Sequence, residues 1–166
     1  DLMIDNYLWG SCDFISPEAP VQVINVESES TMLGGAGNVI NNLKALGAQV
    51  DVISVVGNCK TSDELKELLS DIEVDTQYLI TQKNRITSKK SRIIASQQQV
   101  VRYDRESTDE IDVESQSIII NTFKKIIKNY EVILLSDYGK GVLTKKLTQS
   151  LINFANKSGK KMLIDP

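Results

Sequence analysis

Apolar positions recur along this chain with two periods, which predict helices and strands in alternation. Residues Asp112–Asn129 and Thr144–Ser158 carry apolar residues three and four apart, as a helix with one buried face does. Val132–Leu135 and Lys161–Ile164 are short and largely apolar, as strands buried on both faces are. Such an order predicts an α/β fold with a parallel sheet, helices on both faces and right-handed crossovers.

The first half of the chain continues this alternation. Gln49–Val56 is a β-branched run that predicts a strand, and Gln77–Ile80 predicts another. Between them, Thr61–Asp71 predicts a helix whose N-terminal cap is Thr61 or Ser62.

A glycine segment, Leu33–Asn38 (LGGAGN), precedes a further helical stripe that Gly47 ends. Glycines let the backbone turn tightly and approach a ligand closely. The unpaired amides of a helix start suit a phosphate or a polyol. A tight turn that only packs the helix explains the same residues.

Two segments depart from the buried pattern and predict a small lid sheet. Pro20–Glu27 alternates apolar and polar residues, and Arg85–Glu106 predicts two strands joined near Ser96. We therefore expect one domain over residues 1–166 with lid segments at about 11–27 and 84–106. Asp1 begins in what looks like the downstream half of a strand, so we expect the chain to be a fragment.

The amino-acid composition limits which partners and which kinds of catalysis are compatible with this chain. The net charge of −3 argues against nucleic-acid or membrane partners, and no apolar run reaches the roughly 20 residues of a spanning helix. The chain has no histidine, which excludes Ser-His-Asp and Cys-His catalysis and makes a transition-metal site improbable. Cys12 and Cys59 are far apart, as reduced cytoplasmic thiols often are, and no protein-held metal site is predicted.

Polar residues follow the strands where parallel sheets bind their ligands, beyond the carboxyl ends. Asp5 and Asn38 could bind the hydroxyls of a polyol, although a turn carboxylate and a local backbone bond explain them equally well. Lys140, between two glycines, is either a site residue or a solvated lysine. The strand exits as a group are Asp1–Tyr7, the glycine segment, Leu135–Gly141 and Ile164–Pro166.

The second lid segment adds cations. Strand geometry puts Lys90 and Arg92 on one face, where they could clamp a phosphate, or they could simply charge an edge strand. Among Gln97–Gln99 we expect at least one side chain to face inward.

Taken together, these motifs resemble the ribokinase (PfkB-type) carbohydrate kinases over essentially all 166 residues. The motifs are DLMIDNYLWG, ISPEAPVQV, LGGAGNV, QQQVVRYD, LSDYGKGVLT and LIDP. Within that superfamily the chain looks like the heptose 7-phosphate kinases that begin ADP-heptose synthesis, for lipopolysaccharide, in Gram-negative bacteria. In many species that kinase is the N-terminal part of a bifunctional kinase and adenylyltransferase. The resemblance implies a truncated ribokinase-like three-layer α/β/α fold with a small β lid.

The resemblance also implies roles and partners. The reaction would transfer the γ-phosphoryl of ATP, with Mg²⁺, to the C1 hydroxyl of D-glycero-D-manno-heptose 7-phosphate. The lid strands would pair two subunits into a homodimer in the cytoplasm. The implied substrate-binding residues are Asp5, Gly34, Gly35, Asn38, Lys90, Arg92, Gln98, Arg102, Asp137, Tyr138 and Lys140.

This sequence departs from the family's pattern in one respect, the catalytic base. That residue, an Asp in a GAGD-type element, is expected downstream of Pro166, so no catalytic residue is named and the 166 residues alone are expected to be inactive. Another sugar or nucleoside kinase of the superfamily is the nearest alternative. A dinucleotide-binding oxidoreductase domain fits less well, because the third spaced glycine of its fingerprint is absent. A non-enzymatic sugar-sensing module is the remaining alternative.

Overall fold

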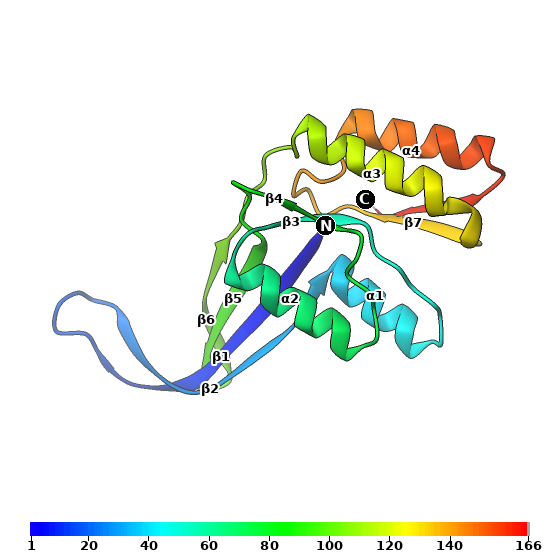
Figure 1. Ribbon diagram of the computed structural model, residues 1–166. Helices are drawn as coiled ribbons and strands as arrows, with labels where there is room; N and C mark the ends of the chain where they lie inside the picture. The colour runs from blue at the N-terminus through cyan, green and yellow to red at the C-terminus, as the bar shows by residue number, and fades with distance from the viewer. Residues whose placement is uncertain (166) are drawn as a thin grey trace.

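A computed structural model describes residues 1–165, and Pro166, which belongs to the fourth strand exit, lies outside the described residues. Two long strands, β1 (Leu2–Ile15) and β2 (Gln22–Gly35), form an antiparallel hairpin. Strand β5 (Ser88–Ala95) runs parallel to β1, and β6 (Gln98–Arg105) pairs antiparallel with β5. The four make one sheet in the order β2-β1-β5-β6 (Figure 1).

The remaining strands form two parallel pairs. Strands β3 (Ser54–Gly57) and β4 (Leu79–Gln82) make one, and β7 (Val132–Ser136) and β8 (Lys161–Asp165) make the other. This confirms the α/β class, but with β1 and β5 the parallel pairs lie in three sheets rather than one. A groove of about 810 Å³ is lined by residues 48–54, which lead into β3, and by β7.

Helices cover one side of the four-stranded sheet and one side of the β7–β8 pair (Figure 1). Helices α1 (Ala36–Ala45) and α2 (Lys60–Asp71) pack on the four-stranded sheet and β3. Helices α3 (Val113–Ile126) and α4 (Lys145–Lys157) pack side by side on β7 and β8, and a 3₁₀ turn, η1 (Ile127–Asn129), ends α3.

Two hydrophobic cores hold these layers. One joins Ile4 of β1 and Leu33 of β2 to Leu65 and Leu69 of α2. The other joins Phe123 of α3 to the facing residues of α4 and β7. Burial of such side chains contributes roughly 1.5–3 kcal/mol each, so every helix is anchored by its apolar stripe.

Most predicted elements are confirmed, and the differences have local causes. The α2 cap is Cys59, not Thr61 or Ser62, because the Ser62 hydroxyl turns inward and donates to the Gly57 carbonyl at 2.5 Å. Strand β4 begins two residues later than predicted, since the Asp75 carboxylate accepts from the Gln77 amide at 2.8 Å and forms a turn.

Strand boundaries differ more in two other places. Residues 49–53 precede β3 without joining a ladder, since they line the groove instead. Strand β2 is longer than the predicted Pro20–Glu27 and continues into the glycine segment, because β1 pairs with it along its whole length.

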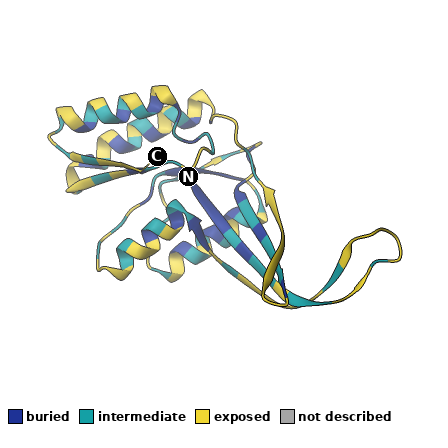
Figure 2. Ribbon diagram, turned by 180° about the vertical axis from the view of Figure 1, so that it is seen from behind, coloured by how far each residue is buried: buried dark blue, intermediate teal, exposed yellow. Residues whose placement is uncertain are grey.

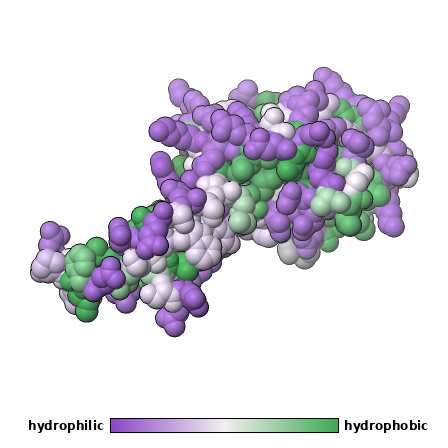
Figure 3. Space-filling model, turned by 90° about the horizontal axis from the view of Figure 1, so that it is seen from below, coloured by the Kyte–Doolittle hydropathy of each residue, from purple (hydrophilic) through white to green (hydrophobic). Residues whose placement is uncertain are grey.

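The distal part of the β1–β2 hairpin, residues 10–26, projects from the body, and we call it the arm (Figure 1). Figure 2 shows exposed residues along the arm and β6, in contrast to the buried inner strands. Phe14, Ile15, Val21 and Val26 are exposed apolar residues of the arm. Hydrophobic surface is visible on the arm and on the body in Figure 3.

Candidate functional site

The four-stranded sheet has one face under helices and one polar face. Ile4 is fully buried in the helix-side core, and Lys89 contacts Glu64 of α2 at 3.0 Å. Because side chains alternate along a strand, Asp5, Lys90 and Arg92 lie on the opposite face. The register pairs Asp5 with Lys90 directly across β1 and β5. The prediction that Lys90 and Arg92 share a face is thus confirmed.

The glycine turn and Asp5 lie together. A Cβ atom at Gly34 would lie 2.3 Å from Oδ2 of Asp5, so the missing side chain is what makes room for the carboxylate. Gly35 caps α1 with φ at 52°, a conformation that favours glycine. The start of α1 is therefore adjacent to a carboxylate, a combination that can both donate to and accept from a polyol.

Arg92 is held from two sides. Its Nη1 donates to Oδ1 of Asp5 at 2.5 Å, and its guanidinium lies 5.2 Å from the centre of the Tyr7 ring. The hydrogen bond to Asp5 raises the pKa of Arg92 above its usual value. This cation is therefore already paired, which differs from the free phosphate clamp that its spacing suggested.

Lys90 is also paired. Its Nζ lies 2.7 Å from Oδ2 of Asp104 and 3.7 Å from Oε2 of Glu106. Arg102 contacts Asp104 through Nε at 3.1 Å. The hydrogen bond from Lys90 lowers the pKa of Asp104. Strand β6 thus places an acidic partner beside the β5 lysine.

Lys140 enters this cluster from the other half of the molecule. Its Nζ donates to Oε1 of Glu106 at 2.8 Å, so Glu106 lies between a lysine of β5 and a lysine of the loop after β7. The charged cluster contains four cations and three carboxylates. Its members are Asp5, Lys90, Arg92, Arg102, Asp104, Glu106 and Lys140.

The loop that carries Lys140 is fixed by two buried charges. Oδ2 of Asp1 accepts from the amides of Tyr138 and Lys140, both at 2.9 Å. The Arg85 guanidinium donates to the Lys140 carbonyl and, at 3.1 Å, to the Asp109 carbonyl. Burial lowers the pKa of Arg85. The lysine therefore projects from a rigid backbone.

Other predicted residues lie at the edge of the cluster or away from it. Asn38 is exposed on the first turn of α1, and Tyr138 is 41% exposed in the loop. Oδ1 of Asp137 accepts from the Gly139 amide at 2.9 Å, inside the same loop.

Gln98 is not brought to the cluster. The register places it beside Ala95 and Gly10, five residues along β1 from Asp5 and therefore about 17 Å away. The expectation that one of Gln97–Gln99 faces inward is wrong, because all three are exposed at the free end of the β5–β6 hairpin.

Four residues of this region, Asp1, Arg85, Asp104 and Glu106, were not predicted as site residues from the sequence. The alternation of Arg102, Asp104 and Glu106 was a usable signal, since it puts all three on one face. No local pattern indicates that Asp1 and Arg85 bind a loop more than 50 residues away.

The described residues supply only part of the chemistry that the implied kinase reaction needs. Each of the carboxylates Asp5, Asp104 and Glu106 is bound by a cation, and residues 1–165 contain no group of three or more acidic or sulfur ligands suited to a metal ion. A Mg²⁺ site is thus not formed by the described residues.

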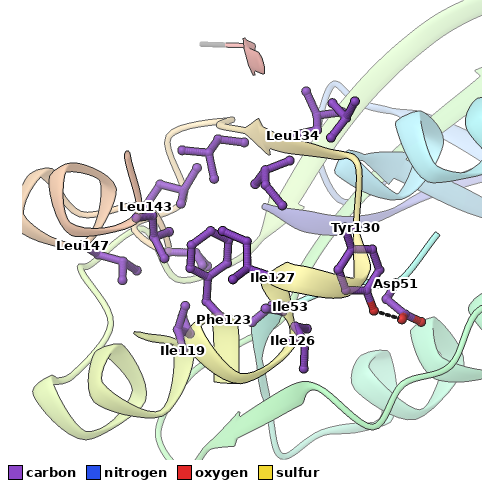
Figure 4. Close-up of a pocket in the computed structure, with 15 residues that line it drawn as sticks. Asp51, Ile53, Ile119, Phe123, Ile126, Ile127, Tyr130, Leu134, Leu143 and Leu147 are labelled. Carbon is purple, nitrogen blue, oxygen red and sulfur yellow. Dashed lines mark hydrogen bonds between the residues drawn. The ribbon is translucent and has the colours of Figure 1, made fainter. Parts of the chain in front are cut away.

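A second cavity, of about 150 Å³, has a different character. It lies between α3, η1 and β7 and is lined mainly by aliphatic side chains, with the Tyr130 hydroxyl donating to Asp51 at its edge (Figure 4). Its lining marks it as a gap in the core rather than a site for a polar ligand.

Comparison with known proteins gives consistent results. The chain is 65% identical to the bifunctional protein HldE of Aliarcobacter butzleri and 55% identical to that of Campylobacter fetus, in each case over all 166 residues. It spans 35% and 36% of these relatives, about a third of their length.

Solved structures share the fold. An Arabidopsis thaliana ribokinase complexed with ribose and ATP matches 99% of this chain and 51% of its own, with a TM-score of 0.66 at 15% identity. Phosphofructokinase-2 from Escherichia coli matches 98% of this chain and 51% of its own, with a TM-score of 0.69 at 18% identity.

Two further findings concern membrane-spanning helices and the family of the chain. Within residues 1–165, every helix is too short or too polar to cross a bilayer. The family model described as pfkB family carbohydrate kinase matches residues 3–166. With the polar sheet face beside the glycine turn, this match establishes that the chain belongs to the pfkB family of carbohydrate kinases.

Proposed function

We propose that this chain forms the sugar-binding part of an ATP-dependent kinase that phosphorylates the C1 hydroxyl of D-glycero-D-manno-heptose 7-phosphate. The product is heptose 1,7-bisphosphate, the precursor class for ADP-heptose and lipopolysaccharide. The relatives named HldE support this, together with one observation: Asp5 lies against the Gly34 turn and contacts Arg92. A hydroxyl-binding group and a phosphate-binding group are then adjacent.

The proposed binding mode starts from the paired cluster. The sugar hydroxyls bind Asp5 and the backbone around Gly35, with Asn38 at the rim. The phosphate binds Arg92 and Lys90 in place of their carboxylate partners. A phosphate can replace these carboxylates because it carries more negative charge than a carboxylate and forms charge-assisted, bidentate bonds with arginine.

The charge balance favours an anionic substrate. The cluster has one more cation than carboxylates, and a phosphate monoester brings negative charge to it. A kinase for a neutral sugar needs no such excess. The family match also removes the dinucleotide-binding oxidoreductase alternative.

The chain's own contribution to phosphoryl transfer is positioning. Lys140 on its fixed loop and Asp137 line the side of the site toward the nucleotide in this proposal. Holding the C1 hydroxyl in line with the γ-phosphorus supplies much of the rate enhancement in such reactions. Bound Mg²⁺ would neutralise charge on the ATP phosphates, and its ligands and the catalytic Asp are expected beyond Pro166.

A homodimer through the lid strands is part of the proposal. Strand β6 is exposed along its length and forms one edge of its sheet, and the arm carries exposed apolar residues. A second copy would cover both features, and open edges favour such pairing. Cys12 and Cys59 are free thiols, which agrees with a cytoplasmic location.

The test uses a chimera in which this chain replaces the matching residues of the Aliarcobacter butzleri relative. Purified chimera, ATP and Mg²⁺ are incubated with heptose 7-phosphate, and the product is followed by phosphorus NMR. We expect heptose 1,7-bisphosphate, and no turnover by the 166 residues alone. Phosphorylation of unphosphorylated sugars in preference to heptose 7-phosphate would identify another kinase of the family.

A further inference from the structure

An aromatic column lies beside Asp5 on the polar face of β1. Tyr7 and Trp9 lie two and four residues after Asp5, so all three side chains are on the same face of the strand. The two rings stack with centroids 6.0 Å apart and planes 19° from parallel. Nε1 of Trp9 donates to the hydroxyl of Ser30 on β2 at 3.3 Å. The outer ring is therefore tied to the neighbouring strand, and the inner ring is supported by the outer one.

The inner ring contacts the cation of the charged cluster. The Arg92 guanidinium lies 5.2 Å from the Tyr7 ring centre and forms its 2.5 Å contact with Asp5. Register explains the contact, because Tyr7 and Arg92 are directly paired across β1 and β5. The face of an aromatic ring carries partial negative charge and attracts a guanidinium within about 6 Å.

The two contacts of Arg92 respond differently to an anionic ligand. A phosphate competes with the Asp5 carboxylate for the same guanidinium donors, whereas the ring attracts the guanidinium through the partial negative charge of its face and does not compete with phosphate as a carboxylate does. The ring contact can therefore persist while the carboxylate is exchanged for phosphate.

We infer that Tyr7, supported by Trp9, is a positioning residue that keeps Arg92 oriented toward the phosphate of the sugar substrate. The inference rests on the proposed function, and it assigns phosphate selectivity in part to an aromatic residue that acts through the arginine and does not contact the phosphate itself. A lysine at position 92 would keep the charge but lack the forked donors that bind a phosphate through two hydrogen bonds.

The experiment compares Tyr7→Leu and Tyr7→Phe in the chimera with heptose 7-phosphate and with unphosphorylated heptose. For Tyr7→Leu we expect KM for heptose 7-phosphate to rise roughly three- to fivefold, the size of one cation–π contact. The kcat and the KM for unphosphorylated heptose should stay within about twofold by the same argument. Tyr7→Phe keeps the ring and should behave as the parent.

The matched control is Tyr103→Leu. Tyr103 pairs with Ser91, whose side chain is buried on the helix side, so this exposed ring lies on the other face of the sheet. It should leave both KM values unchanged. Thermal unfolding of all variants reports on stability, and Tyr7→Met replaces Tyr7→Leu if the latter does not fold.

Three outcomes would overturn the inference alone. They are an unchanged KM in Tyr7→Leu, equal losses for the two sugars, and a Tyr7→Phe variant as impaired as Tyr7→Leu. A parent chimera that phosphorylates no sugar phosphate would instead overturn the proposed function, and the inference with it.

Discussion

Asp5 and Arg92, 87 residues apart in the chain, form a 2.5 Å ion pair on the polar face of a four-stranded sheet. The parallel pairing of β1 with β5 brings them together. The pair joins a residue suited to hydroxyls and one suited to phosphate, and it is the part of the structure from which the predictions below follow.

Arg92→Ala should weaken recognition of the substrate's phosphate more than recognition of its sugar hydroxyls. Loss of hydrogen bonds to a charged group costs about 1.5–3 kcal/mol, so we expect kcat/KM for heptose 7-phosphate to fall roughly 10- to 150-fold. The unphosphorylated sugar should be far less affected. Steady-state kinetics of the chimera measure this, with Arg105→Ala, on the opposite face of β6, as the control. Equal losses for both sugars would argue against a phosphate role.

Gly34→Ala should destabilise the site because of Asp5. The new Cβ would lie 2.3 Å from Oδ2 of Asp5, and steric overpacking costs typically about 1–3 kcal/mol. In an Asp5→Ala background the same substitution should cost clearly less. Urea unfolding of the four proteins completes a double-mutant cycle. Additive effects would show that the carboxylate and the glycine are not coupled.

Asp1→Ala should loosen the Lys140 loop. The substitution leaves the amides of Tyr138 and Lys140 without their shared acceptor, and the loss of hydrogen bonds to a charged group costs about 1.5–3 kcal/mol. We expect a lower melting temperature and faster hydrogen exchange confined to residues 138–142. Asp13→Ala, in the exposed arm, is the control. Unchanged exchange in the loop would contradict the assignment.

The dimer proposal predicts that charge on the β6 edge favours monomers. Val101 is 46% exposed on this edge strand, and Val101→Glu would put an unpaired carboxylate into the proposed interface. We expect size-exclusion chromatography with light scattering to give a dimer for the parent chimera and a monomer for the variant. The exposed Leu46, 84% accessible beyond α1, is the site of the control Leu46→Glu. A monomeric parent would exclude the interface.

The Cys59 thiol provides a prediction of pH dependence. Burial raises its pKa, but hydrogen bonds from Ser62 and Thr87 outweigh burial and lower it from 9.0 to about 7. Thiolate, and hence reaction with iodoacetamide, should therefore appear with a midpoint near pH 7 in a Cys12→Ser background. Ser62→Ala should move the midpoint upward. The folded pKa is the lower one, so ionisation favours the folded state above pH 9, and this contribution disappears as pH falls through 7.

The helices were predictable because their signals are local. The apolar stripes before Gly47, after Asp112 and after Thr144 each depend on residues three or four apart, and the structure has helices at all three places. The N-terminal cap of α2 is the exception. Ser62 has the chemistry of a cap, yet its hydroxyl contacts Gly57 and Thr87, which only the folded chain brings near it.

The amino-acid sequence by itself determined the α/β order and the glycine turn, and it put Lys90 and Arg92 on a common face, because strand period and backbone freedom depend on neighbouring residues. Tertiary structure decided which charges meet: Arg92 with Asp5, Lys90 with Asp104, and Lys140 with Glu106. It also left Gln98 far from the cluster. Strand register and loop placement depend on packing between distant segments, and no local pattern encodes them.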